Sequence, residues 1–296
     1  MPIPRPATPD PLRPDLGSLE AAWAARVAAD REQVERAREV DDPADYYAPT
    51  AGRFRPAPDR PVDPVAGILA AIAHPDDTWL DIGAGGGRYA VPLGRITRGV
   101  VAVEPSPAMR AVLQDEIARS DGSRVRVVAE SWPPPGWPDP AAVAPYAASV
   151  GLFAHVGYDI AAIGPFLDAL EAAVTRRCVA VVAEGAMTTI ARLLWEPIHG
   201  EPRILLPALP ELLAVLIARG RLPELRLVPR VVPVYASADE LHEVARRQLW
   251  LRPGSALDRR LATLLPAVAT RTEAGWTVDP EPTRIGVLSW APEVDR

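Results

Sequence analysis

Short apolar runs alternate with amphipathic stretches over most of this chain. Apolar runs bounded by turn residues are typical of buried strands, and apolar positions three or four residues apart are typical of helices. Strands that alternate with helices of this length predict a parallel sheet with right-handed crossovers. The predicted strands span residues 78–82, 99–104, 124–129, 148–153, 177–183, 226–235 and 284–290, and the predicted helices span 18–39, 64–72, 108–117 and 164–175, with another starting near Gly86 and helical pairs within 187–224 and 238–270.

The N-terminal part of the chain differs from the rest. Residues 1–62 predict an arm that has a proline-rich start, one amphipathic helix, and an acidic, aromatic loop around residues 41–48. Residues 63–296 predict an α/β domain with a seven-stranded, mostly parallel sheet and helices on both faces. Its helical insertions are expected at about 187–224 and 238–270.

A glycine-rich segment follows the first predicted strand. The chain reads Asp-Ile-Gly-Ala-Gly-Gly-Gly from Asp81 to Gly87, and Glu104 ends the next strand. Glycine lacks a Cβ, so the backbone can turn sharply and approach a ligand closely. A helix starting near Gly86 would aim free N–H groups at that ligand, and Glu104 stands where a nucleotide ribose offers its hydroxyls. The segment therefore predicts a nucleoside-containing cofactor.

The order of acid and glycines separates the candidate cofactors. A dinucleotide fingerprint needs Gly-x-Gly-x-x-Gly, and its last glycine would fall on Arg88. A carboxylate at Asp81 would repel a pyrophosphate but suits a cationic amino-acid group. Residues 81–87 and 101–105, the latter continuing into Ser-Pro-Ala-Met, resemble the class I S-adenosylmethionine-dependent methyltransferases. The alternatives are a structural glycine turn in another doubly wound protein and an NAD-type oxidoreductase.

This resemblance implies a fold and a set of cofactor contacts. The implied fold is a Rossmann-like α/β sheet with an antiparallel last strand and helical cap insertions, to which the pattern of apolar residues adds an N-terminal helix. Asp81 and the glycine backbone would hold the methionine part of S-adenosylmethionine, and Glu104 the ribose. The corner at residues 130–132 would hold adenine, with Glu130 or the Ser131 backbone binding its amino group. Trp132 would either stack on the adenine ring or be a core aromatic residue. The implied cofactor-binding residues are Asp81, Gly83, Ala84, Gly85, Gly87, Glu104, Pro105, Glu130, Ser131, Trp132 and His155.

The loop after the fourth predicted strand holds the candidates for catalysis. The family commonly places substrate-facing groups here, and an imidazole at His155 could take a proton from an attacking hydroxyl or amine. His155 could equally orient the loop or cap the next helix. Tyr158 shares the loop, and Asp159 could orient His155 or cap a helix starting near Ile160.

Four aromatic or imidazole side chains are candidates for the substrate side. Tyr46 and Tyr47 could close over the cofactor as a lid that excludes water, or they could anchor the arm on the domain surface. Trp195 and His199 could line the substrate pocket, or they could pack inside a cap helix. Aromatic lids exclude water from a reacting centre, and we favour that interpretation for the tyrosine pair.

The composition excludes several subclasses of the family. The chain has 35 Pro and 32 basic residues, but no Lys and no Asn. Without Asn, neither the Asn-Pro-Pro-Tyr site of amino-methylating enzymes nor the Asp-Asn metal cluster of catechol-type enzymes can exist. Without Lys, the lysine-containing tetrad of ribose methyltransferases is also impossible. We therefore expect a metal-independent reaction with no metal ligands.

Charge and hydropathy limit the partners. A net charge of −6 and a pI of about 5.4 argue against a nucleic-acid substrate. No apolar run reaches the ~20 residues of a membrane span, and the N-terminus lacks the apolar core of a signal peptide. We expect no membrane partner and a cytoplasmic location. Cys178, the single cysteine, lies in an apolar run that predicts a buried, inert thiol.

These patterns predict an enzyme that moves a methyl group from S-adenosylmethionine to an oxygen or nitrogen of a small molecule, by in-line transfer. One alternative is a protein that binds S-adenosylmethionine without catalysis, as a sensor or scaffold. Another is a methyltransferase for protein side chains, which would need an open, acidic groove in place of an enclosed pocket. The acceptor atom and the oligomeric state stay undetermined, because the capping segments carry no motif.

Overall fold

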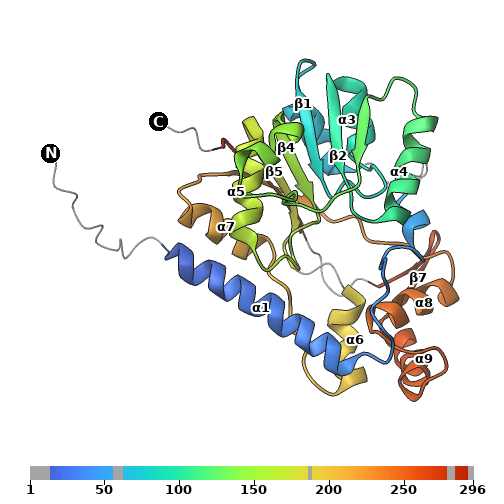
Figure 1. The fold of residues 1–296 in the computed structure, drawn as a ribbon. Helices are drawn as coiled ribbons and strands as arrows, with labels where there is room; N and C mark the ends of the chain where they lie inside the picture. Colours follow the sequence, from blue (N-terminus) through green and yellow to red (C-terminus); the bar gives the residue numbers. More distant parts are fainter. Residues whose placement is uncertain (1–13, 56–62, 186–188, 279–283, 293–296) are drawn as a thin grey trace.

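A seven-stranded sheet forms the centre of the molecule (Figure 1). The computed structural model describes residues 14–55, 63–185, 189–278 and 284–292. In these residues the strand order is β3-β2-β1-β4-β5-β9-β6; β9 is antiparallel to both neighbours, and the other pairings are parallel. The predicted α/β fold is confirmed. The strands are β1 Thr78–Ile82, β2 Gly99–Val103, β3 Val125–Val128, β4 Ala148–Ala154, β5 Val174–Ala183, β6 Glu224–Pro229 and β9 Arg284–Trp290.

Two groups of helices cover the sheet. Helix α3 contacts both α2 and α4, and α1 contacts both α5 and α7, which makes a second group. The central strands are buried along most of their length, as expected of a sheet covered on both faces. The helices are α1 Leu16–Ala37, α2 Pro64–Ile72, α3 Ala90–Ile96, α4 Pro107–Arg119, α5 Ile163–Ala173 and α7 Leu209–Ala218, with the 3₁₀ turns η1 Ala51–Phe54, η2 Pro140–Ala142 and η3 Ala144–Tyr146.

The strand order places a topological switch point between β1 and β4. From β1 the chain moves outward to β2 and β3, and it then returns to the other side of β1 for β4 and β5. Crossovers that leave a strand in opposite directions open a crevice at the carboxyl ends of the strands, where α/β proteins bind their ligands. The structure thus identifies the carboxyl edge of β1 and β4 as the place to look for a site.

A second hydrophobic core lies outside the sheet. It is built by α6 Thr189–His199, α8 Ala238–Gln248, α9 Ala256–Val268 and the hairpin of β7 Thr270–Thr272 and β8 Gly275–Thr277, here called the cap. Figure 1 shows the cap helices gathered at the lower end of the molecule, apart from the helices on the sheet. The cap segments leave and rejoin the sheet at the carboxyl ends of β5 and β6 and the start of β9.

Helix α1 connects the two cores. Trp23 and Val27, in its middle, are buried in the core of the sheet, and the Trp23 indole N–H donates to the Ile160 carbonyl at 2.9 Å. Val34 and Ala37, at its end, pack against the core of the cap. The predicted N-terminal helix therefore exists, and it serves both parts of the protein.

Three predicted element boundaries were wrong. The helix expected near Gly86 begins at Ala90, because Gly85 and Gly87 have φ of +55° and +87°, which no α-helix accepts. The strand expected over 226–235 ends at Pro229, since proline cannot donate to a ladder. The helix expected to reach residue 175 ends at Ala173, where β-branched residues start β5.

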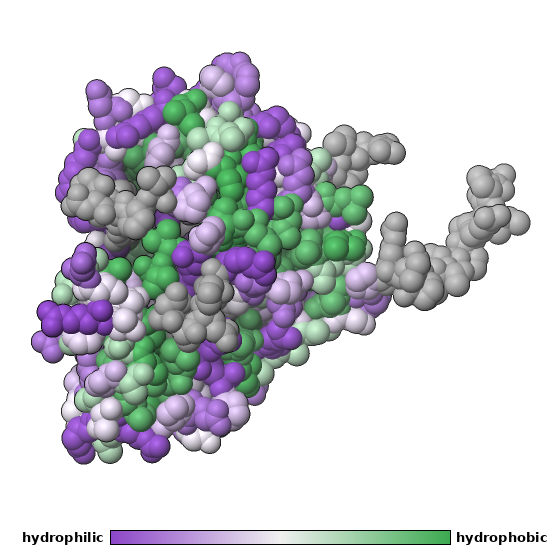
Figure 2. Space-filling view, turned by 180° about the vertical axis from the view of Figure 1, so that it is seen from behind, coloured by the Kyte–Doolittle hydropathy of each residue, from purple (hydrophilic) through white to green (hydrophobic). Residues whose placement is uncertain are grey.

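The surface away from the view of Figure 1 carries a band of hydrophobic residues between hydrophilic areas (Figure 2). Large apolar side chains that are exposed include Leu222, Leu225 and Leu227, on and beside the edge strand β6. In the part of the chain that the structure describes, no helix has both the length and the apolar character needed to span a bilayer.

Candidate functional site

The turn after β1 needs glycine for two separate reasons. Gly83 has φ of +70°, and a Cβ there would lie 2.4 Å from Val156 Cγ2. The backbone N–H groups of Gly83 and Ala84 donate to the Val103 carbonyl at 2.8 and 3.1 Å, which joins the turn to the end of β2. Gly85 also has a positive φ, but a Cβ there would meet no atom within 4 Å. The turn is therefore packed on one side and open beside Gly85.

Glu104 closes this turn from the neighbouring strand. Its side chain is 5% exposed; Oε2 accepts from the Gly85 N–H at 2.7 Å and Oε1 from the Ser106 N–H at 2.8 Å. Burial raises the pKa of Glu104, although these two hydrogen bonds and the charge of Arg110 oppose the shift. Each carboxylate oxygen has two lone pairs, so both can still accept from a ligand hydroxyl.

Asp81 lies at the end of β1, on the same edge of the sheet. The side chain is 2% exposed, and burial, with the charge of Glu104 as second cause, raises its pKa to about 7. The Ala90 N–H, which donates to the carboxylate, opposes this shift. Two buried carboxylates in one place favour a ligand that carries positive charge, because a nearby cation offsets both the burial and their repulsion.

His155 directly follows β4, which pairs with the strand that carries Asp81. Its φ is +57°, and its backbone N–H donates to the Val181 carbonyl at 2.8 Å. Burial lowers the pKa of His155 to about 4, and the charges of Arg88 and Arg230 add to this shift. The charge of Asp63 opposes it. The imidazole is therefore neutral at physiological pH. A left-handed backbone at a non-glycine residue is uncommon, and it gathers at functional sites.

Tyr158 supports this loop, whereas Asp159 is exposed. The Tyr158 hydroxyl accepts from the Ala183 N–H at 2.7 Å and lies 3.5 Å from His155 Nδ1. Burial raises the pKa of Tyr158 above its usual range. Among the described residues, no hydrogen bond joins Asp159 to His155, and α5 begins at Ile163 without a side-chain cap. Asp159 therefore has neither of the two roles considered for it.

The corner after β3 is built around Trp132. The Trp132 ring is buried in the core, its indole N–H donates to the Phe166 carbonyl at 3.2 Å, and it makes an edge contact with Tyr146 at 5.5 Å. The Tyr146 hydroxyl donates to Glu130. Ser131 is exposed. The structure places Trp132 as a core aromatic residue and leaves Glu130 and the Ser131 backbone as the polar groups of the corner.

Residues 41–55, here called the strap, cross the carboxyl edge of the sheet. Asp45 accepts from the Ser106 hydroxyl at 2.9 Å and from the Ala108 N–H at 3.1 Å, at the start of α4. A Cβ on Gly86 would lie 2.8 Å from the Phe54 carbonyl oxygen, so η1 lies directly against the glycine turn. Further along, Arg53 forms an ion pair with Glu240 of the cap at 2.7 Å. The strap thus joins the cap to the predicted cofactor edge.

The two tyrosines of the strap have different surroundings. Tyr46 packs against Trp250 at 5.7 Å, and Arg247 lies over its ring at 5.6 Å. Burial raises the pKa of Tyr47 to about 12, and the charges of Asp159 and Glu104 add to the shift. Tyr46 therefore anchors the strap on the cap, whereas the ring of Tyr47 lies 5.8 Å from that of Phe54 in η1.

Trp195 and His199 lie inside the cap. Trp195 is fully buried, its ring centre is 4.3 Å from that of His199, and the Arg203 guanidinium lies 4.3 Å from it. His199 Nε2 is 3.1 Å from the Leu249 carbonyl oxygen. Trp195 belongs to the second core and the half-buried His199 packs against it, as the alternative of a packed cap helix expects.

Sequence reasoning missed the residues that hold the site together. Asp45 is one of several acids in its loop, and no pattern distinguishes it from the others. Ser106 was detectable, because Ser-Pro before a helix is the usual order of N-cap and first turn, and its hydroxyl does accept from the Met109 N–H. Over the described ranges, no three His, Cys, Asp or Glu side chains are grouped so that they could hold a metal ion.

The fold is that of the class I S-adenosylmethionine-dependent methyltransferases. No protein-family model and no curated protein matches the sequence. The methyltransferase from Geobacter sulfurreducens solved with S-adenosylhomocysteine is 18% identical with a TM-score of 0.50, over 86% of this chain and 99% of that one. The corresponding complex from Thiobacillus denitrificans is 14% identical with a TM-score of 0.51, over 86% and 100%. The YcgJ protein from Bacillus subtilis is 14% identical with a TM-score of 0.52, over 77% and 98%.

Proposed function

We propose that this protein transfers a methyl group from S-adenosylmethionine to a small-molecule acceptor. The observation that carries the proposal is the arrangement of Asp81, the open glycine turn and Glu104 at the crevice of the sheet. Two of the similar structures were solved with S-adenosylhomocysteine, which supports the same cofactor here.

The charges of the site suit this cofactor better than a dinucleotide. S-adenosylmethionine has an ammonium and a sulfonium and no phosphate, so it brings positive charge to two buried carboxylates. A pyrophosphate would instead meet Asp81 as a like charge. The open space beside Gly85 allows close approach of the cofactor to the backbone, and the free lone pairs of Glu104 suit ribose hydroxyls.

The protein's contribution to the reaction is positioning of the reactants and exclusion of water. When bound, S-adenosylmethionine supplies a methyl group already activated by its sulfonium. The strap, which Asp45 fastens to the start of α4, would cover the cofactor edge. His155, neutral and at the end of β4, would accept the hydrogen bond of an acceptor hydroxyl or amine and orient it for in-line attack. The acceptor would enter between the carboxyl edge and the cap.

The proposal is tested by calorimetric titration with S-adenosylmethionine, S-adenosylhomocysteine and NAD. We expect saturable binding of the first two and none of NAD. Glu104→Ala is expected to weaken binding by at least about tenfold, since hydrogen bonds to a charged group are lost. Glu184→Ala is the matched control, because Glu184 also follows a strand but pairs with Arg284 at the surface. Binding of NAD alone would overturn the proposal. Cofactor binding with no methylation in an acceptor screen would favour a sensor.

His155→Asn is expected to lower kcat by about tenfold at saturating cofactor, because the hydrogen bond to the acceptor is lost. Asn tolerates the left-handed backbone, whereas His155→Ala should also lower stability by about 1 kcal/mol. For the unchanged protein, kcat should show no acid limb near pH 6.5, since the pKa of His155 is about 4. The measurement is release of S-adenosylhomocysteine between pH 5 and 8. An unchanged kcat in the Asn variant would remove His155 from the reaction.

A further inference from the structure

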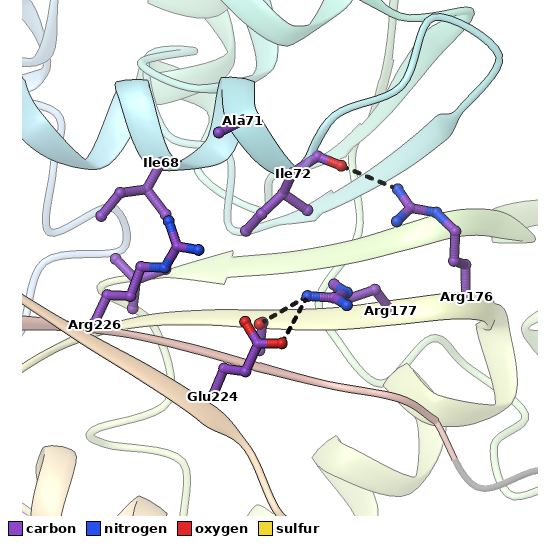
Figure 3. Close-up of a pocket in the computed structure, with 9 residues that line it drawn as sticks. Ile68, Ala71, Ile72, Arg176, Arg177, Glu224 and Arg226 are labelled. Atoms are coloured by element: carbon purple, nitrogen blue, oxygen red, sulfur yellow. Dashed lines mark hydrogen bonds and ion pairs between the residues drawn. The ribbon is translucent and has the colours of Figure 1, made fainter.

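A cavity of about 210 Å³ lies at the opposite edge of the sheet from the proposed site (Figure 3). It opens between α2 and the starts of β5 and β6, with the end of antiparallel β9 as its floor. Along β5, Arg177 in this cavity is separated from Ala183 at the carboxyl edge by six residues, roughly 20 Å of extended chain. The cavity is therefore no part of the cofactor crevice.

Three arginines line this cavity, and they differ in how closely a carboxylate pairs with each one. Arg176 forms a two-point ion pair with Asp77 and donates to the Ile72 carbonyl at 3.3 Å. Arg177 donates to the Ser289 hydroxyl at 3.2 Å, and its guanidinium is 3.8 Å from Glu224. Figure 3 shows these contacts from Arg177 and shows Arg226 on the other side of the cavity, beside Ile68.

Arg226 has no hydrogen bond and no ion pair with any residue that the structure describes. With Arg176 paired to Asp77, two guanidinium groups remain and face the single carboxylate of Glu224. One positive charge of the cavity is thus left over, in a chain whose net charge is −6. Planar guanidinium groups bind carboxylate and phosphate oxygens with paired hydrogen bonds.

We propose that this cavity binds a small organic anion. Its carboxylate or phosphate would lie between Arg177 and Arg226, and its apolar part would lie against Ile68, Ile72 and Val287. The volume is below that of pockets for drug-sized ligands, which start at about 300 Å³, so the ligand is a small acid. The site is separate from the methyl-transfer site and does not depend on it.

Calorimetric titration of the full chain with benzoate, formate and inorganic phosphate tests this site without any methylation cofactor. We expect saturable binding of benzoate, several-fold tighter than that of formate because only benzoate reaches the apolar wall. Arg226→Gln should weaken binding at least about tenfold. Arg98→Gln, an exposed arginine outside the cavity, is the control and should leave the affinity unchanged.

Removal of the charge of Glu224 is a second test, in which the affinity for the anion should rise instead of fall. Glu224→Gln is expected to tighten anion binding several-fold, because it removes a like charge from the cavity. Thermal unfolding of each variant establishes that it is folded. The proposal is overturned if none of the three anions binds saturably, or if Arg226→Gln and Arg98→Gln have the same effect. Equal affinities for benzoate and formate would overturn the role of the apolar wall.

Discussion

Replacing Asp81 with Asn is expected to weaken S-adenosylmethionine binding by about 100-fold while making the protein without cofactor more stable at pH 8. The loss of binding follows because a buried carboxylate that pairs with the cofactor ammonium is removed. The gain in stability follows from the cost of keeping Asp81 ionised when it is 2% exposed and close to Glu104. Asp81→Asn should thus lower the affinity for the cofactor and raise the stability of the cofactor-free protein at the same time.

The pH dependence gives the sign of this effect. The pKa of Asp81 is about 7 in the folded protein and 3.8 in a model peptide, so the folded state binds this proton more tightly. The contribution of this bound proton to the free energy of unfolding is fully present below pH 3.8 and is lost as the pH rises through 7. At pH 8 the cost is on the order of 2–4 kcal/mol, which Asn avoids, and near pH 4 the difference should vanish.

Urea unfolding of both proteins at pH 4 and pH 8, together with titration of the cofactor from pH 8 to 5.5, measures these quantities. In the unchanged protein, affinity should fall below pH 7, because the cofactor cation must displace a proton from Asp81. Asp159→Asn, which removes an exposed carboxylate, is the control. An Asp81→Asn variant that is less stable at pH 8, or that keeps its affinity for the cofactor, contradicts the assigned role.

Gly83→Ala and Gly85→Ala are expected to have different effects, although the two glycines lie two residues apart and both have a positive φ. Gly83→Ala should cost about 3 kcal/mol of unfolding free energy, since strain adds to the clash with Val156. Gly85→Ala should cost only about 1 kcal/mol, because its Cβ meets open space. That open space is where the cofactor is proposed to lie, so Gly85→Ala should lose cofactor affinity while still folded.

Chemical denaturation gives the two stabilities, and calorimetry of Gly85→Ala with S-adenosylhomocysteine gives the affinity. The comparison is internal, because each variant is the control for the other. Equal losses of stability would mean that Val156 moves aside easily. Unchanged affinity in Gly85→Ala would place the cofactor elsewhere than beside this turn.

The sheet and the glycine turn were predictable because their signals are local. Apolar runs indicate the buried strands, and glycines at Gly83, Gly85 and Gly87 indicate a turn with three left-handed residues. The start of α3 was missed because the same positive φ values delay the helix until Ala90. Local signals thus identify the elements better than they identify their ends.

The aromatic residues show where sequence reasoning fails. Trp132 and Trp195 are both buried, and nothing in the sequence tells which core each one joins. The cap core is assembled from α6 and from residues after β6, so its existence depends on contacts between distant segments. For the same reason Asp45 could not be assigned: its partners, Ser106 and Ala108, are 61 and 63 residues away.

Helix α1 limits how far the sheet and the cap can move relative to each other, and so limits how ligands enter and leave. It is 22 residues long, roughly 33 Å, and it is fastened at its middle to the sheet and at its end to the cap. A helix that packs against both parts resists a hinge motion that would bring the cap closer to the sheet. Entry and exit of ligands would then depend on small local movements, because α1 resists a change in the arrangement of the sheet and the cap. Such a protein would select acceptors by rigid fit, and the strap is the segment best placed to open and close.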